Sequence, residues 1–113
     1  MARATTRVDG VSLGEPDRET LALSGALTFA TAAHAFAEGG RALASGVQTR
    51  LDLGGVTRAD SAGLACVLAL AANAGRAGRR LAVVHWPEGL RALAAVCDVE
   101  TLLDRSVDPP AAV

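Results

Sequence analysis

The stretch that decides the fold of this chain is Asp60-Ser61-Ala62-Gly63-Leu64, which opens an apolar helical run. A strand-like run, Thr49-Arg50-Leu51-Asp52-Leu53, precedes it, and residues 54–63 connect the two. A hydroxyl residue beside a carboxylate therefore stands where a helix begins. The first N–H groups of a helix have no intrahelical partner and lie at the positive end of its dipole. Ser61 can therefore cap this helix or carry a phosphate that these groups would bind.

Strand and helix patterns alternate on both sides of this stretch. We expect strands at 11–14, 19–25, 47–53 and 79–85, and helices at 28–38, 61–73, 88–97 and 99–103. The predicted order is β-β-α-β-α-β-α-α, with Thr28 as the N-cap of the first helix. Strands separated by helices pair in parallel through right-handed crossovers, whereas the first two strands share a short turn. The sequence thus predicts an α/β fold with a small, mixed, mostly parallel sheet covered by helices.

Composition limits the classes of function. The chain has 113 residues, enough for one domain, and its 11 basic residues nearly balance its 12 acidic ones. This balance gives no electrostatic reason to expect nucleic acid or an anionic membrane as a partner. The longest apolar run, 64–72, is too short to insert into a bilayer, and residues 1–7 lack the apolar segment of a signal peptide. We expect a soluble, cytoplasmic protein with flexible ends at 1–7 and 105–113.

Catalytic and metal-binding patterns are missing from the sequence. It contains no phosphate-binding loop, no dinucleotide-binding turn and no nucleophile elbow. Cys66 and Cys97 are far apart and are predicted to be small core residues. His34 is expected to be a solvated helix residue and His85 a residue at a strand end. The sequence therefore predicts a protein that is not an enzyme and that uses no metal or cofactor.

Several segments resemble one known family. Residues 51–64 are similar to the signature of the STAS domain, in which an apolar strand and a loop lead into Asp-Ser/Thr-small-Gly-Leu at the start of a helix. Residues 21–27 resemble the second strand of that domain. Residues 86–94 and 99–103 are most similar to MlaB, the Mla-type member of the family. The resemblance implies a single STAS domain over residues 8–104.

The resemblance also implies a function. MlaB-like proteins are accessory subunits that bind the cytoplasmic MlaF-like ATPase of an MlaFEDB-type ABC transporter, and through it the permease. They support assembly and activity of a system that transports phospholipid and maintains outer-membrane lipid asymmetry. Such a subunit would lie at the cytoplasmic face of the inner membrane through its partner. The alternative branch of the family is the anti-sigma factor antagonist, in which a partner kinase would phosphorylate Ser61.

Both branches place a protein contact at the start of the second helix, and there the matching residues are Asp60, Ser61, Ala62, Gly63 and Leu64. We expect Ser61 to cap the helix and to contact the partner, while its phosphorylation stays open. Glycine in a first turn lowers helix propensity but lets another backbone approach closely, which a cap does not require.

Phe36 is a further candidate for the partner contact. It shares a helical stripe with Phe29, Ala32 and Ala33, for which core packing is the default. The rest of that helix is nearly all alanine, so one aromatic side chain is free to face a partner.

Overall fold

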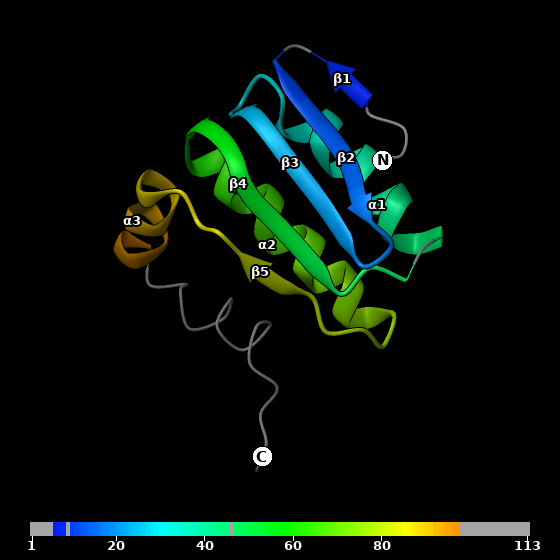
Figure 1. The fold of residues 1–113 in the computed structure, drawn as a ribbon. Helices are drawn as coiled ribbons and strands as arrows, with labels where there is room; N and C mark the ends of the chain where they lie inside the picture. The colour runs from blue at the N-terminus through cyan, green and yellow to red at the C-terminus, as the bar shows by residue number, and fades with distance from the viewer. Residues whose placement is uncertain (1–5, 9, 46, 98–113) are drawn as a thin grey trace.

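A computed structural model describes residues 6–8, 10–45 and 47–97, which form one sheet with its strands in chain order (Figure 1). The strands are β1 (Thr6–Val8), β2 (Val11–Asp17), β3 (Thr20–Leu27), β4 (Arg50–Ala59) and β5 (Ala82–Val84). β1, β2 and β3 pair antiparallel, whereas β3, β4 and β5 pair in parallel. The predicted mixed α/β sheet is confirmed, with one more antiparallel pairing than expected because β1 precedes β2.

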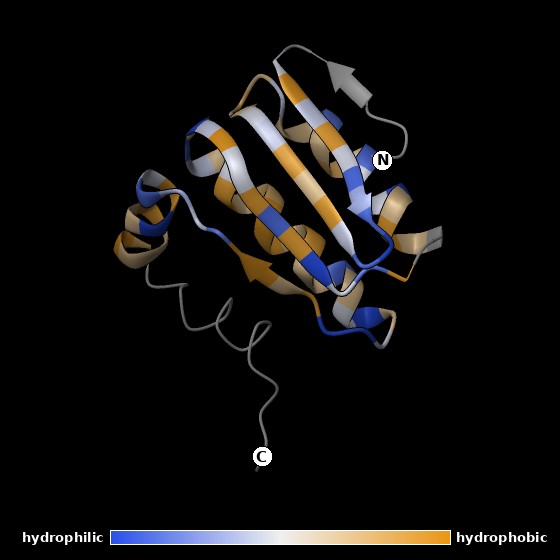
Figure 2. Cartoon of the chain, in the orientation of Figure 1, coloured by the Kyte–Doolittle hydropathy of each residue, from blue (hydrophilic) through white to orange (hydrophobic). Residues whose placement is uncertain are grey.

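Two helices form a layer on one face of the sheet, and a third lies beside it. α1 (Ala32–Ser45) and α2 (Ser61–Arg76) pack against each other behind the sheet, and α3 (Glu88–Val96) lies near β4 (Figure 1). Along β2 and β4, hydrophobic and more polar residues alternate, whereas β5 is hydrophobic throughout (Figure 2). Residues on the inner face of β3 and β4 are fully buried, namely Leu21, Leu23, Leu51 and Leu53. This alternation directs one face of each strand into the core beneath α1 and α2.

The element boundaries differ from the predicted ones at several places. The sequence predicts a flexible N-terminus up to residue 7, yet Thr6–Val8 forms β1, which pairs with β2 across a turn at Gly10 (φ 94°). The first helix begins at Ala32 rather than at Thr28, because residues 28–31 form a turn. β4 continues to Ala59, so almost no loop separates it from α2. The helix predicted at 99–103 and the tail at 105–113 lie outside the described residues.

The cysteine and histidine predictions have mixed outcomes. Cys66 is buried in α2 as expected, but Cys97 is exposed. The prediction for Cys97 was wrong because α3 buries Leu90 and ends at Val96, so the next position of the stripe lies beyond the packed part of the helix. His34 is half-buried rather than solvated, and its Nε2 atom has no hydrogen-bond partner among the described residues.

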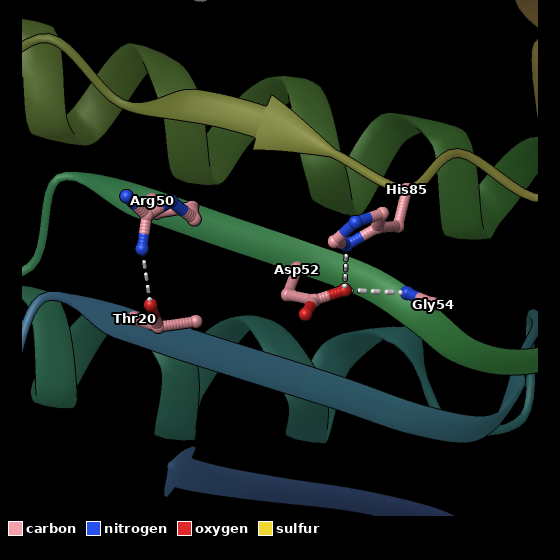
Figure 3. Close-up of polar contacts among 5 residues, drawn as sticks. All are labelled: Thr20, Arg50, Asp52, Gly54 and His85. Carbon is pink, nitrogen blue, oxygen red and sulfur yellow. Dashed lines mark hydrogen bonds and ion pairs between the residues drawn. The ribbon is translucent and has the colours of Figure 1, made fainter. Parts of the chain in front are cut away.

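The face of the sheet away from the helices carries a row of polar side chains (Figure 3). On β4 the Arg50 guanidinium donates to the Thr20 hydroxyl at 3.0 Å, and Asp52 Oδ1 lies 3.1 Å from His85 Nδ1. Asp52 also accepts from the Gly54 N–H group at 2.8 Å. His85 directly follows β5, as predicted, and in the described part of the chain it is the one non-glycine residue with positive φ (58°).

Candidate docking site

Asp60, not Ser61, caps helix α2. Its backbone is extended (φ −131°, ψ −169°), and its Oδ1 atom accepts from the N–H groups of Ala62 at 3.0 Å and Gly63 at 3.1 Å. An N-cap must have this non-helical backbone so that its side chain can reach the free N–H groups of the first turn. Ser61 is already the first helical residue. The prediction that Ser61 caps the helix was therefore wrong by one position.

The second carboxylate oxygen of Asp60 reaches a different part of the chain. Asp60 Oδ2 accepts from the backbone N–H group of Phe29 at 3.0 Å, and the Asp60 N–H group donates to the Leu27 carbonyl at 3.4 Å. The bond from Phe29, with further bonds from Gly63 and Ala62, lowers the pKa of Asp60 below its ordinary value because these donors stabilise the ionised form. One carboxylate therefore connects the turn after β3 to the start of α2.

Gly63 is required by the fold of the chain itself. A Cβ atom at this position would lie 2.1 Å from the carbonyl oxygen of Leu27, so only glycine lets α2 begin against the end of β3. The backbone that approaches Gly63 is thus internal. Leu64, the next residue, is 3% exposed and packs in the core. Gly63 and Leu64 are both buried and support the start of α2 from the core side. A partner could not reach either residue from the surface.

Ser61 lies at the surface. Its side chain is exposed, and within the described ranges its hydroxyl has no hydrogen-bond partner. Ala62 beside it is half-buried, and Ala65, one turn further along α2, is exposed. Of the five residues predicted at the start of this helix, Asp60, Ser61 and Ala62 therefore contribute to the surface, with Ser61 the most accessible.

The two phenylalanines lie in different environments. Phe36 on α1 is half-buried and packs against the core, whereas Phe29 is 85% exposed. Phe29 is not part of the helical stripe that the sequence suggested, because α1 starts three residues later. The partner role assigned to Phe36 stays a prediction, but exposure favours Phe29, which we did not place among the site residues.

The turn that carries Phe29 is fixed by a threonine. The Thr31 hydroxyl donates to the Ala26 carbonyl at 2.8 Å and accepts from the Thr28 N–H group at 2.9 Å. Thr31 is 1% exposed. A hydroxyl at residue 31, directly before the alanine-rich helix, was the sequence signal that could have located this turn.

Arg58 is a further exposed residue close in sequence to Asp60 and Ser61. It is exposed near the end of β4, where it pairs in register with Ala26 of β3. In the part of the chain that the structure describes, no carboxylate forms an ion pair with it. We call Phe29, Arg58, Asp60, Ser61 and Ala62 the candidate docking surface. It lies at the carboxyl ends of two adjacent parallel strands, where open α/β sheets commonly bind their ligands.

This fold is that of SpoIIAA, and two solved structures of that protein match the chain. One is described as the anti-sigma factor antagonist SpoIIAA in its unphosphorylated form; it has 20% identity and a TM-score of 0.57, and covers 74% of this chain and 79% of its own. The other is the Bacillus cell fate determinant SpoIIAA in the phosphorylated form, with 18% identity, a TM-score of 0.60, and coverage of 84% and 97%. At these identities the likeness shows a shared fold.

Sequence comparison defines the family. The family model described as "Mlab, STAS domain" matches residues 12–104. The chain therefore belongs to the STAS domain family, in its Mlab type. No curated protein matches it at a significant level.

Membrane-spanning helices and metal clusters are absent from the described residues. Within residues 6–8, 10–45 and 47–97, no helix combines the length and apolar character needed to cross a bilayer. The same residues contain no group of three or more His, Cys, Asp or Glu side chains that could hold a metal ion. The candidate docking surface itself offers a hydroxyl, a phenyl ring and a guanidinium.

Proposed function

We propose that this protein is a non-enzymatic accessory subunit that binds the cytoplasmic ATPase of an MlaFEDB-type ABC transporter and supports phospholipid transport. The observation that carries the proposal is the exposed Ser61 hydroxyl, which has no hydrogen-bond partner among the described residues, on a domain of the Mlab type. A hydroxyl directed outward at the start of a helix is available to a partner, since Asp60 already provides the cap. The backbone of Phe29 is bonded to Asp60, the neighbour of Ser61, and the ring of Phe29 is exposed.

The surface has the composition expected of a protein interface. Interfaces are enriched in aromatic residues and arginine, and their hot spots are surrounded by contacts that exclude water. Phe29 and Arg58 are of the enriched types. Docking through this end of the sheet would leave the opposite end, near residues 18–19 and 47–49, exposed.

Capture of the tagged chain from its own cells, followed by mass spectrometry, tests this function. Recovery of an ABC ATPase together with its permease is the expected result. Binding is then measured by titration of the purified ATPase. A Ser61→Asp variant provides the site test, and Thr49→Asp adds the same charge at an exposed position at the other end of the sheet. Equal affinity of both variants and the native chain would contradict docking at Ser61.

A second function is favoured by one observation, the accessibility of Ser61 to a kinase. The two SpoIIAA structures are described as an unphosphorylated and a phosphorylated form, and the Ser61 hydroxyl of this chain makes no bond to any described residue that would have to break first. In this alternative the chain is an anti-sigma factor antagonist regulated by phosphorylation of Ser61. Recovery of an anti-sigma factor kinase instead of a transporter, with loss of ATP-dependent phosphorylation in Ser61→Ala, would favour it.

A further inference from the structure

Phe29 is an exposed aromatic residue held in a fixed position. Its ring is 85% exposed, but its backbone N–H group is bonded to Asp60 Oδ2 at 3.0 Å. The turn around it is closed by the bond from the Thr31 N–H group to the Thr28 carbonyl at 2.9 Å. Binding then costs no ordering of the backbone at this turn, and the phenyl side chain has only two rotatable bonds to restrict. The turn thus holds the backbone of an exposed ring in place for contact.

The charges around Phe29 indicate what a partner must supply. Arg58 is exposed and has no ion-pair partner among the described residues. The carboxylate of Asp60 is directed to three backbone N–H groups of its own chain, two through Oδ1 and one through Oδ2. The guanidinium is therefore the charge on this surface that a partner can pair with. Complementarity calls for a carboxylate on the partner.

We propose that Phe29 is the anchor of the candidate docking surface, and that it inserts into an apolar pocket of the partner whose rim carries a carboxylate facing Arg58. Asp60 is a positioning residue, because its two oxygens fix the turn of Phe29 relative to Ser61. This assignment rests on the proposed function, in that the partner is the transporter ATPase that docks at Ser61.

Truncation of the ring tests the anchor. Phe29→Ala is expected to weaken binding of the purified ATPase subunit by roughly thirty-fold or more, the loss typical of a hot spot. Val96→Ala is the matched control, since Val96 is 83% exposed but lies on α3, and it should bind as the native chain does. An unchanged affinity for Phe29→Ala would overturn the assignment. Phe29 is exposed, so circular dichroism and thermal unfolding should show a native fold.

A double-variant cycle tests the role of Asp60. Asp60→Asn keeps an oxygen for the cap but removes the charge and one of the two oxygens that connect α2 to Phe29. If Asp60 acts by positioning Phe29, the combined Asp60→Asn and Phe29→Ala variant should bind no more weakly than Phe29→Ala alone. Additive losses would show that Asp60 acts independently of the ring and would overturn its positioning role.

Charge reversal tests the partner chemistry. Arg58→Glu should weaken binding more than Arg58→Gln, because it places like charges opposite one another. Equal effects of the two variants would overturn the proposal that a carboxylate of the partner faces Arg58.

The outcomes separate this assignment from the proposed function. Loss of binding in Ser61→Asp with native binding in Phe29→Ala would leave the docking function intact and overturn the anchor alone. Failure of the native chain to bind any transporter ATPase would overturn both. A concentration-dependent dimer that disappears in Phe29→Ala, measured by analytical ultracentrifugation, would show that a second copy of this chain covers the ring, and would also overturn the assignment.

Discussion

At the scale of the residue, a substitution at Ser61 should change the affinity for the partner but hardly change the stability of the fold. Its hydroxyl makes no bond in the described part of the chain, so Ser61→Asp should change the free energy of unfolding by only about 0.5 kcal/mol. A carboxylate in the first helical turn is also compatible with the helix dipole. We expect the same variant to weaken partner binding, because docking would desolvate the new charge. Urea unfolding and a binding titration measure the two effects, and a variant that binds normally would argue against this interface.

The lowered pKa of Asp60 predicts how the free energy of unfolding depends on pH. Its pKa is lowered in the folded state, chiefly by the bond from the Phe29 N–H group, whereas in the unfolded chain it is about 3.9. A lowered folded-state pKa contributes stability above the unfolded value, and this stability is lost as the pH falls through the folded value. The native chain should therefore be more stable than Asp60→Asn at neutral pH, and the difference should shrink in acid. Urea unfolding of both proteins between pH 7 and pH 3 checks this, and a constant difference would contradict it.

At the scale of the element, the start of α2 depends on one glycine. Gly63→Ala would place a Cβ atom 2.1 Å from the Leu27 carbonyl oxygen, so α2 or β3 must shift. Overpacking of this kind typically costs about 1–3 kcal/mol. Gly75→Ala is the matched control on the same helix, because a Cβ atom there meets no atom within 4 Å and should add about 0.5–1 kcal/mol of stability. Thermal unfolding of the two variants should show shifts of opposite sign.

The sequence predicted those elements whose pattern is local. Alternation placed Leu21 and Leu23 inside the sheet, and the apolar run from Leu64 marked α2. The prediction failed where a contact between separate segments of the chain decides at which residue an element begins. Thr28 and Thr31 both suit a helix start, but the bond from Thr31 to the Ala26 carbonyl, which delays the helix to Ala32, depends on how the turn folds back on β3.

The place of residues 60–64 in the fold was predicted, since they directly follow β4 and open α2. Their contact with a partner stays a prediction. Their division into a cap, a surface hydroxyl and two buried supports follows from the approach of β3, which the local sequence does not encode. The sequence left open which of Phe29 and Phe36 faces a partner for the same reason, since the backbone position of Phe29 depends on a hydrogen bond with a residue 31 positions away.

At the scale of the whole molecule, the sheet has one face covered by helices and one face without a described helix. The candidate docking surface lies at only one end of the sheet. Phe29, Arg58 and Ser61 lie at the carboxyl ends of β3 and β4. The uncovered face carries polar contacts such as Asp52–His85 (Figure 3). Docking at the end of the sheet would therefore leave this face and the core beneath the helices unchanged.

The integrity of that core can be followed through its cysteines. Burial in α2 raises the pKa of the Cys66 thiol to about 11, whereas Cys97 after α3 is exposed. The thiolate is the reactive form, so a thiol reagent at pH 8 should modify native protein at Cys97 alone. Cys66 should react only when the core opens, at a rate that follows the global unfolding equilibrium as urea is added. Mass spectrometry of the modified protein measures both reactions. The Cys97→Ser variant is the control and should show no fast modification. Equal reactivity of both thiols in the native protein would contradict the packing of α2 against the sheet.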